Sequence, residues 1–149
     1  MRALIQRVGH SAVTVADQTV GEIGPGLLVF LGITHDDTSE HADQLATKTV
    51  HLRIFDDDHG KMNRSVQDIG GSILVVPQFT LYADLKGARR PNFVAAARPD
   101  LAEPLFERYV ARLRTLTTVP IVTGVFRAAM QVGLVNDGPV TIWLDSKLL

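Results

Sequence analysis

Leu134-Val135-Asn136-Asp137-Gly138-Pro139-Val140-Thr141 is the stretch of this chain that says most about its fold and its function. The pair Asp137-Gly138 is typical of a tight turn between two strands. Pro139 adds to this signal, because the bond before a proline adopts the cis form more readily than other peptide bonds. Gly138 has no Cβ, so neighbouring carbonyl groups can approach a ligand closely. The stretch predicts either a plain hairpin loop or a rigid backbone element that contacts a small ligand.

A second stretch, Gly71 to Leu81, reads as a buried strand with a polar and aromatic end. Residues 72–76 form its apolar run, and Gln78-Phe79-Thr80 follows shortly after. Thr80 is the one nucleophile candidate at the end of a buried strand. A threonine hydroxyl needs a base, however, and no histidine lies nearby in the sequence. Phe79 suits either the core or a ligand contact.

The composition is that of an ordinary folded protein and excludes several classes. A length of 149 residues suits one domain, and 46% hydrophobic with 21% charged residues is a globular composition. A net charge of −1 excludes a strongly basic nucleic-acid binder, although a local basic patch remains open. The absence of cysteine excludes disulfides and thiolate metal sites. No apolar run approaches the ~18 residues of a membrane span, so we expect a cytoplasmic protein without a membrane partner.

The pattern along the chain predicts an α/β fold. One helix is expected to begin at Asp37 as its cap, and another at Asp100, where Pro104 conflicts with such a start. The order of strands, helix, strand, helix and strands indicates one compact domain over residues 1–149 with a mixed sheet. The expected strands are 2–8, 11–16, 27–34, 72–76, 120–126, 128–135 and 139–144.

Two clusters of charged residues can be explained either by simple solvation or by a function. Histidines and aspartates around position 37 fit a solvated helix start better than a metal site, and we expect no metal. The loop expected over residues 82–99 is basic, which suits either simple solvation or contacts with nucleic-acid phosphates. Its cations are Lys86, Arg89, Arg90 and Arg98.

The chain resembles the D-aminoacyl-tRNA deacylase family nearly from end to end. The family's first motif normally opens with serine, and this chain has Pro77 there, so no role of that serine carries over. The resemblance implies a barrel-like mixed sheet and two main helices. Ordered blocks at family-like spacing carry it: Ala3-Leu4-Ile5-Gln6-Arg7-Val8, Gly21-Glu22-Ile23-Gly24, Gly26-Leu27-Leu28-Val29, Arg53-Ile54-Phe55, Gly60-Lys61-Met62-Asn63, Gln78-Phe79-Thr80-Leu81, Arg90-Pro91, Met130-Gln131-Val132 and Asn136 to Thr141.

The resemblance implies an editing hydrolase that cleaves the ester bond between a D-amino acid and the terminal ribose of tRNA. Such an enzyme needs no cofactor, because the ester is already activated and the protein has to position it and polarise its carbonyl group. Gln78, Phe79 and Thr80 are the implied catalytic residues, acting through the backbone or through side chains. Leu81 and Met130 fall on implied substrate-binding positions.

Selectivity for the D form is implied to come from a cis Gly138-Pro139 pair. In the family this pair enters the pocket of the partner subunit in a homodimer, where its carbonyl groups collide with an L side chain. Arg7 matches the arginine that holds the pair. Glycine has no side chain, so we also expect activity on glycyl-tRNA. DNA is not an expected partner.

Two other functions remain open at this point. One is a non-catalytic dimer that binds tRNA or other RNA and whose hydrolytic site is impaired by Pro77. The other is a deacylase of a related branch with relaxed chirality. The first differs from the editing hydrolase in turnover, and the geometry of the Gly138-Pro139 peptide bond separates the second from it.

Overall fold

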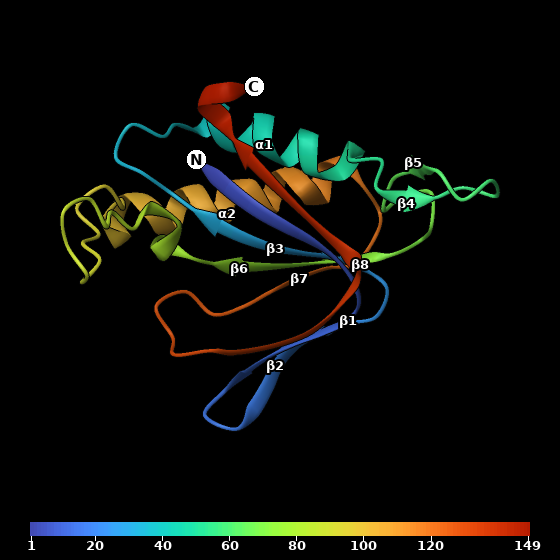
Figure 1. The fold of residues 1–149 in the computed structure, drawn as a ribbon, viewed down its shortest axis with the longest axis horizontal. Coiled ribbons are helices and arrows are strands. Elements are labelled where there is room, and N and C mark those ends of the chain that lie inside the picture. Colours follow the sequence, from blue (N-terminus) through green and yellow to red (C-terminus); the bar gives the residue numbers. More distant parts are fainter.

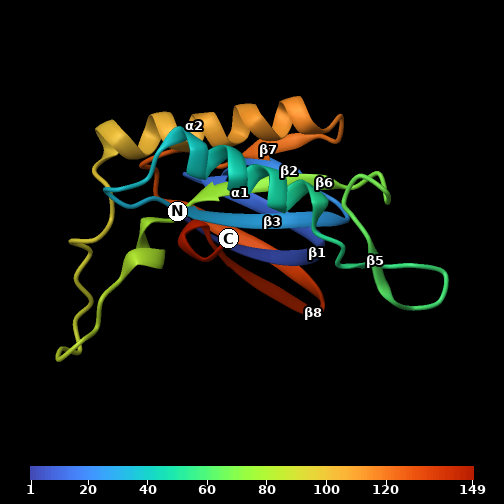
Figure 2. The same cartoon turned by 90° about the horizontal axis from the view of Figure 1, so that it is seen from above.

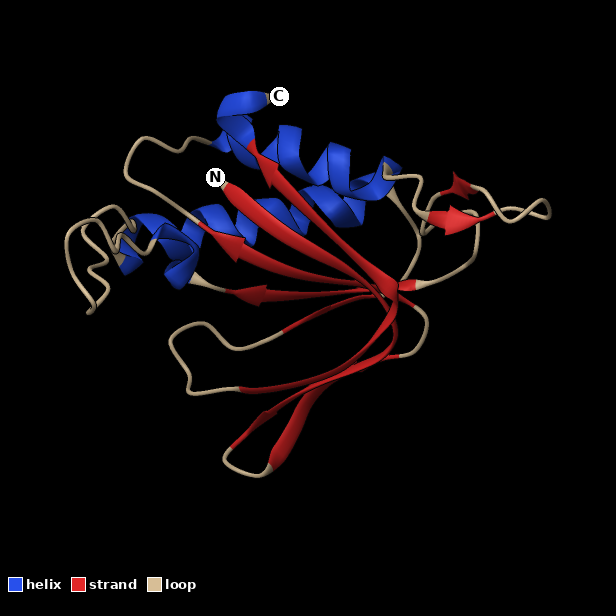
Figure 3. Cartoon of the chain, in the orientation of Figure 1, coloured by secondary structure: helices blue, strands red, loops and turns tan.

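The computed structural model describes residues 1–149 as a curved sheet with two α-helices on one of its faces (Figures 1 and 3). The sheet order is β2-β1-β3-β6-β7, and β8 pairs with β1 as well. The strands of the sheet are β1 (Arg2–Val15), β2 (Gln18–Ile23), β3 (Gly26–Gly32), β6 (Ser72–Pro77), β7 (Ile121–Thr123) and β8 (Gln131–Asp145). The other elements are α1 (Ser39–His51), α2 (Pro99–Leu116), the small hairpin β4 (Phe55–Asp56) and β5 (Met62–Arg64), and the 3₁₀ turns η1 (Phe79–Tyr82) and η2 (Ser146–Leu148).

Two parallel crossovers bring α1 and α2 onto the same face of the sheet. β3 pairs parallel to β6, and β6 pairs parallel to β7, with α1 in the first connection and α2 in the second. Figure 2 shows the yellow loop after η1 extending away from the sheet. The apolar stripes of the helices face the larger core. Thr49 and Tyr109 join the two helices inside it by a hydroxyl–hydroxyl hydrogen bond of 2.7 Å.

The sheet curves until its two ends meet, which confirms the barrel-like mixed sheet (Figure 3). At Gly21 in β2, an added Cβ would lie only 2.7 Å from the Cγ1 atom of Val122 in β7, so glycine is what allows these strands to approach. A second, smaller core fills the inside of the curve. It consists of Val8, Val13, Ile23, Leu28, Leu74 and Val76.

The helix starts differ in detail from the sequence prediction. The cap of α1 is Thr38, whose N–H donates to the Nδ1 atom of His41 at 3.2 Å, and not Asp37. Asp37 instead turns inward, where its buried carboxylate pairs with the α-ammonium group of Met1 and accepts from the Thr34 N–H. α2 begins at Pro99 and continues through Pro104, which costs one intrahelical hydrogen bond. No helix combines the length and apolarity needed to cross a lipid bilayer.

The hairpin reading of Asp137-Gly138 is wrong. The strands expected on either side of it form one long strand, β8, and both halves pair with β1. Gln6 pairs with Thr141 and Val8 pairs with Asn136, so an advance of two residues along β1 corresponds to five residues along β8. The extra residues form a bulge over Asp137–Pro139, which bends the strand without reversing it. β1 is likewise one strand, where the sequence predicted two.

Candidate functional site

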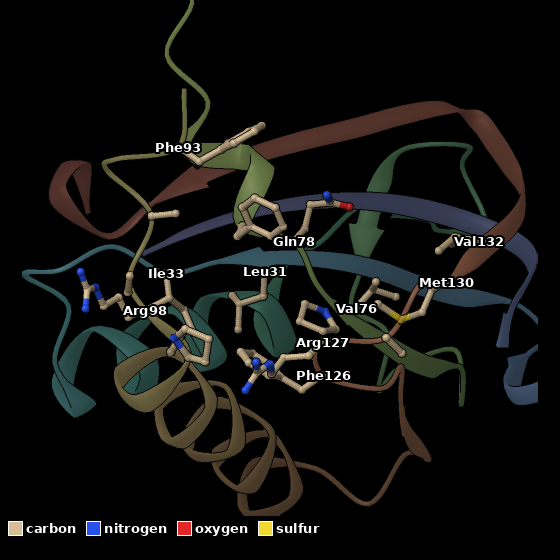
Figure 4. A pocket seen from close by; sticks show the side chains of 17 residues that line it. Leu31, Ile33, Val76, Gln78, Phe93, Arg98, Phe126, Arg127, Met130 and Val132 are labelled. Atoms are coloured by element: carbon tan, nitrogen blue, oxygen red, sulfur yellow. The ribbon is translucent and has the colours of Figure 1, made fainter. Parts of the chain in front are cut away.

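A cavity of about 630 Å³ opens at the carboxyl ends of β3 and β6 (Figure 4). The side chains around it come from these strand ends, from η1 and the loop after it, from the first turn of α2 and from the segment between β7 and β8. Crevices at the carboxyl ends of parallel strands are the usual ligand sites of α/β sheets. The lining is mainly apolar, and only Gln78, Arg98 and Arg127 bring polar side chains to it.

Pro77 stands at the end of β6 without breaking the sheet. Gln78 still donates its N–H to the Leu31 carbonyl of β3 at 2.8 Å. On its other side β6 faces β7, and only every second residue of β6 points its N–H that way, as Ile73 does when it donates to the Pro120 carbonyl at 3.0 Å. Pairing of β6 with β7 ends at Val75, two residues before the proline. Pro77 therefore lacks an N–H where no ladder partner remains, and its side chain lines the cavity.

The η1 turn places Phe79 at the cavity and directs the next residues elsewhere. Phe79 is 57% exposed, and its ring meets the edge of the Phe93 ring at a centroid distance of 5.0 Å. The Thr80 hydroxyl accepts a hydrogen bond from the Gln78 side-chain amide. Of the residues predicted here, Gln78 and Phe79 line the cavity, whereas Thr80 and Leu81 do not.

Two contacts fix η1 against the sheet. The Arg2 guanidinium donates to the Leu81 carbonyl at 2.9 Å and lies over the Tyr82 ring, 4.4 Å from its centroid. At Gly32, an added Cβ would lie 3.0 Å from both the Gln78 carbonyl oxygen and the Leu81 Cβ atom. The close approach of η1 to β3 thus depends on a glycine at the end of β3 and on an arginine at the beginning of β1.

Met130, one of the expected substrate-binding residues, lines the cavity from the segment before β8. Its Sδ atom would lie 2.8 Å from a Cβ added at Gly124. The sequence reasoning missed Phe93, Phe126 and Arg127, which also line the cavity. Phe93 lies in a polar loop, where an aromatic residue suggests a contact with a ligand or another segment. Nothing in the sequence singles out Arg127, because its residue type does not predict its backbone conformation.

Arg7 and the bulge of β8 form a separate cluster. The buried Arg7 side chain donates from Nε to the Asp137 carbonyl at 2.8 Å and from Nη1 to the Ile54 carbonyl at 2.7 Å. The Asn136 amide accepts from the Val140 N–H at 2.8 Å and donates to the Val140 carbonyl at 3.3 Å. The Gly138–Pro139 bond is cis, and both residues are exposed.

The bulge and the cavity lie at opposite ends of β3. Arg7 pairs with Leu27, and Leu31 borders the cavity four residues further along, which is about 13 Å of strand. Neither Gly138 nor Pro139 lines the cavity. The structure therefore divides the predicted site residues within one chain into two groups.

The cavity holds no side chain suited to acid–base catalysis. No histidine, aspartate or glutamate lines it. His35, the histidine in contact with the adjoining loop, bonds to the Val94 carbonyl at 2.7 Å. Burial, helped by the Asp37 carboxylate, raises the pKa of the Tyr82 hydroxyl, so Tyr82 stays protonated. The lining therefore offers an amide, two guanidinium groups and backbone groups, and no side chain that acts as a general acid or base.

Comparisons with known proteins agree with each other along almost the entire chain. Residues 4–145 match the family model described as D-Tyr-tRNA(Tyr) deacylase. The D-aminoacyl-tRNA deacylase of Chloroflexus aurantiacus is 56% identical over 146 residues, which cover 98% of this chain and 91% of that protein. The enzyme of the same name from Thermotoga petrophila is 54% identical over 149 residues, covering 100% and 99%.

Two solved structures share the fold. One, described as c-Myc DNA Unwinding Element Binding Protein, superposes with a TM-score of 0.92 at 40% identity and covers 97% of this chain and 98% of that one. The other is a probable eukaryotic D-amino acid tRNA deacylase, with a TM-score of 0.81 at 20% identity and coverage of 96% and 97%. The second likeness concerns the fold alone.

Proposed function

Because this chain belongs to the D-Tyr-tRNA(Tyr) deacylase family, we propose that it hydrolyses the ester bond of D-aminoacyl-tRNA to give free tRNA and the D-amino acid. The observation that carries this proposal is 56% identity over 98% of the chain to a relative named for that reaction. A mainly apolar cavity of about 630 Å³ with few polar groups supports it, since small-molecule sites have this size and character. With charged tRNA as the substrate, the cytoplasm remains the expected location.

The proposed reaction uses the backbone at the beginning of η1. The oxygen of a water molecule bonds to the ester carbonyl carbon, the carbon–oxygen bond to the ribose breaks, and the ribose oxygen takes the proton that the water loses. The 2′-hydroxyl group next to the ester assists this transfer. Phe79 lines the cavity and Thr80 follows it in the chain; the N–H groups of both start the turn and have no carbonyl partner within it, so they are our donors to the developing oxyanion. The Gln78 amide holds the Thr80 hydroxyl beside them.

The walls of the cavity receive the rest of the substrate. Phe79 and Met130 offer an aromatic and a flexible apolar surface. Leu81 contributes by fixing η1, since its carbonyl accepts from Arg2. The basic loop after η1 is our candidate for contacts with the phosphates of the acceptor end.

Rejection of L substrates is proposed to come from the Gly138–Pro139 carbonyl groups of a second copy of the chain. The bulge is exposed and lies at the other end of β3 from the cavity of its own chain, so it can meet a substrate in another molecule's cavity. Arg7 holds the bulge by its carbonyl group. The active form is then a homodimer, and glycyl-tRNA passes the same gate because glycine has no side chain.

A deacylation assay tests this function directly. D-tyrosyl-tRNA, L-tyrosyl-tRNA and glycyl-tRNA are incubated with the purified protein, and the ester that remains is measured over time. We expect loss of the D-tyrosyl and glycyl esters and survival of the L-tyrosyl ester. Gln78→Ala should slow the D reaction by about 10²-fold, because the hydroxyl beside the oxyanion donors loses its partner. Gln18→Ala, at an exposed position of β2, is the matched control and should leave the rate unchanged.

Survival of D-tyrosyl-tRNA at enzyme concentrations equal to those of the substrate would reject the hydrolase. Equal loss of L- and D-tyrosyl esters would instead reject the chiral gate and favour the relaxed-chirality branch. Persistence of the glycyl ester under conditions that clear the D-tyrosyl ester would remove only the proposal about glycyl-tRNA.

Pro77 is the residue that favours an alternative, a non-catalytic protein that binds RNA. Its position argues for retained activity, because the missing N–H interrupts no ladder hydrogen bond. Pro77→Ser separates the two functions: we expect turnover by the natural protein and a change of less than about tenfold in the variant. An inactive natural protein whose activity appears only with serine would favour the RNA-binding alternative.

A further inference from the structure

Arg127 stands at a position where the backbone favours glycine. The Ala128 N–H donates to the Val125 carbonyl at 3.2 Å and closes a tight turn, in which Arg127 is the third residue with φ of 63°. Type II turns require a positive φ at this place and normally use glycine there, because a Cβ crowds the backbone. An arginine in such a conformation points to a function for its side chain.

The side chain of Arg127 is exposed, lines the cavity and carries an unused positive charge. Figure 4 shows it beside Phe126, with Arg98 at another point of the rim. Neither guanidinium forms an ion pair or a side-chain hydrogen bond in the structure, although most of the chain's other arginines do. No carboxylate lines the cavity to balance them. The cavity is therefore apolar inside and cationic at its edge.

We infer that Arg127 binds the phosphate group on the 5′ side of the substrate's terminal nucleoside. This inference rests on the proposed function, because it names a contact in the same site. Every aminoacyl-tRNA carries that phosphate, next to an uncharged nucleoside that suits the apolar cavity. The free α-amino group of the substrate is itself cationic and would be repelled. A guanidinium matches a phosphate by two parallel hydrogen bonds, which an ammonium group cannot form.

Two small substrates isolate this contact: the 3′-D-tyrosyl ester of adenosine and the same ester of adenosine 5′-monophosphate. The natural protein should cleave the phosphorylated ester with a kcat/KM about tenfold higher, the scale expected for a charge-assisted hydrogen bond. Arg127→Gly should remove that advantage, so that the two esters are cleaved with similar kcat/KM. Arg127→Lys should keep part of it. Arg114→Ala, an exposed arginine near the end of α2, is the control and should keep all of it.

The glycine variant should fold, because glycine readily adopts a φ of 63°, and a thermal melt verifies this. Equal losses on both esters, or none on either, would overturn the inference. A loss confined to D-aspartyl esters would also overturn it, because Arg127 would then bind an acidic side chain. Calorimetric binding of adenosine 5′-monophosphate against adenosine gives the same comparison without turnover. Failure of the natural protein to cleave D-tyrosyl-tRNA would reject the proposed function. Equal affinity for adenosine 5′-monophosphate and adenosine would reject the role of Arg127.

Discussion

The two ends of β3 carry different kinds of surface. At its carboxyl end, side chains from distant parts of the sequence pack into a mainly apolar cavity with Phe79 and Met130 in its wall. At its amino end, the bulge of β8 exposes Gly138 and Pro139 and is held by hydrogen bonds from Arg7. Packing of side chains shapes the first surface, whereas hydrogen bonds to the backbone shape the second.

This difference explains how one chain can carry a reacting site and a selecting site apart from each other. A cavity made of side chains fits the common part of its substrates, and a rigid stretch of backbone reads handedness without regard to side-chain identity. The two lie about 13 Å of strand apart. A homodimer, as proposed, would unite them by placing the bulge of one copy at the cavity of the other.

The largest expected effect comes from mixing two variants with complementary defects. One carries Gln78→Ala with Phe79→Ala in the cavity, and the other carries Gly138→Ala, whose Cβ would lie 2.6 Å from the Val140 nitrogen. Each alone should lose D selectivity or turnover. If the bulge acts across subunits, random reassortment after mixing gives dimers with one intact site and about one quarter of the natural activity. Selective activity is measured with D- and L-tyrosyl-tRNA. No recovery in exchanged dimers, verified by native mass spectrometry, would mean that the two regions do not work together across an interface.

Removing the anchor of the bulge should damage that region more than the cavity. Arg7→Ala leaves the Ile54 and Asp137 carbonyl groups without their charged donor. We expect a loss of about 3 kcal/mol in the free energy of unfolding and slow cleavage of L-tyrosyl-tRNA. Denaturant melts and the D/L rate ratio measure the two effects. Arg7→Lys keeps the positive charge but lacks the several donors of the planar guanidinium, so both effects should be intermediate between those of the natural protein and Arg7→Ala. An unchanged D/L rate ratio in a folded variant would show that the anchoring of the bulge does not determine selectivity.

A smaller effect is expected at Asn136, which holds the bulge from the other side. Asn136→Ala removes the acceptor of the Val140 N–H and the donor to the Val140 carbonyl, at a cost of about 1–2 kcal/mol. Asn136→Asp keeps the acceptor and should lose less. Hydrogen exchange at Val140 follows the loosening directly. Faster exchange in both variants to the same extent would contradict the role of the amide acceptor.

The smallest effect lies in the helix layer, away from both regions. The hydrogen bond from Arg108 lowers the pKa of the Asp43 carboxyl below its usual value. A lowered pKa stabilises the fold above the ordinary pKa of an aspartate and loses this effect as pH falls through the lowered value. Asp43→Asn should therefore lower Tm by no more than about 2 °C at pH 7, and the difference should vanish in acid, below that pKa. A changed D/L ratio in this variant would show that the helix layer also influences selectivity.

Much of the fold was predictable, because hydrophobic patterns report local structure. The strand expected at residues 72–76 is β6, and a helix forms close to each of the two predicted helix starts. The predictions failed where a local signal met a partner far away in sequence. Asp137-Gly138 has the composition of a hairpin turn, yet both of its flanks pair with β1. Asp37 has the composition of a helix cap, yet it pairs with the ammonium group of Met1.

The candidate site divides in the same way. Gln78, Phe79 and Met130 were recognisable as members of family motifs, and all three line the cavity. Thr80 and Leu81, in the same motif, lie outside the lining because η1 turns them away. Arg127 had no signal, because an unusual backbone angle belongs to a turn and not to a residue type.

By itself the sequence determined the family, the α/β class and the residues that carry chemical groups, since ordered motifs and periodic apolar residues are properties of the chain. Only the tertiary structure decided that the motif residues lie at two ends of one strand and that a glycine–proline turn became a bulge. The physical reason is that pairing with β1, the reach of the Arg7 guanidinium and the approach of η1 to Gly32 are contacts between distant segments.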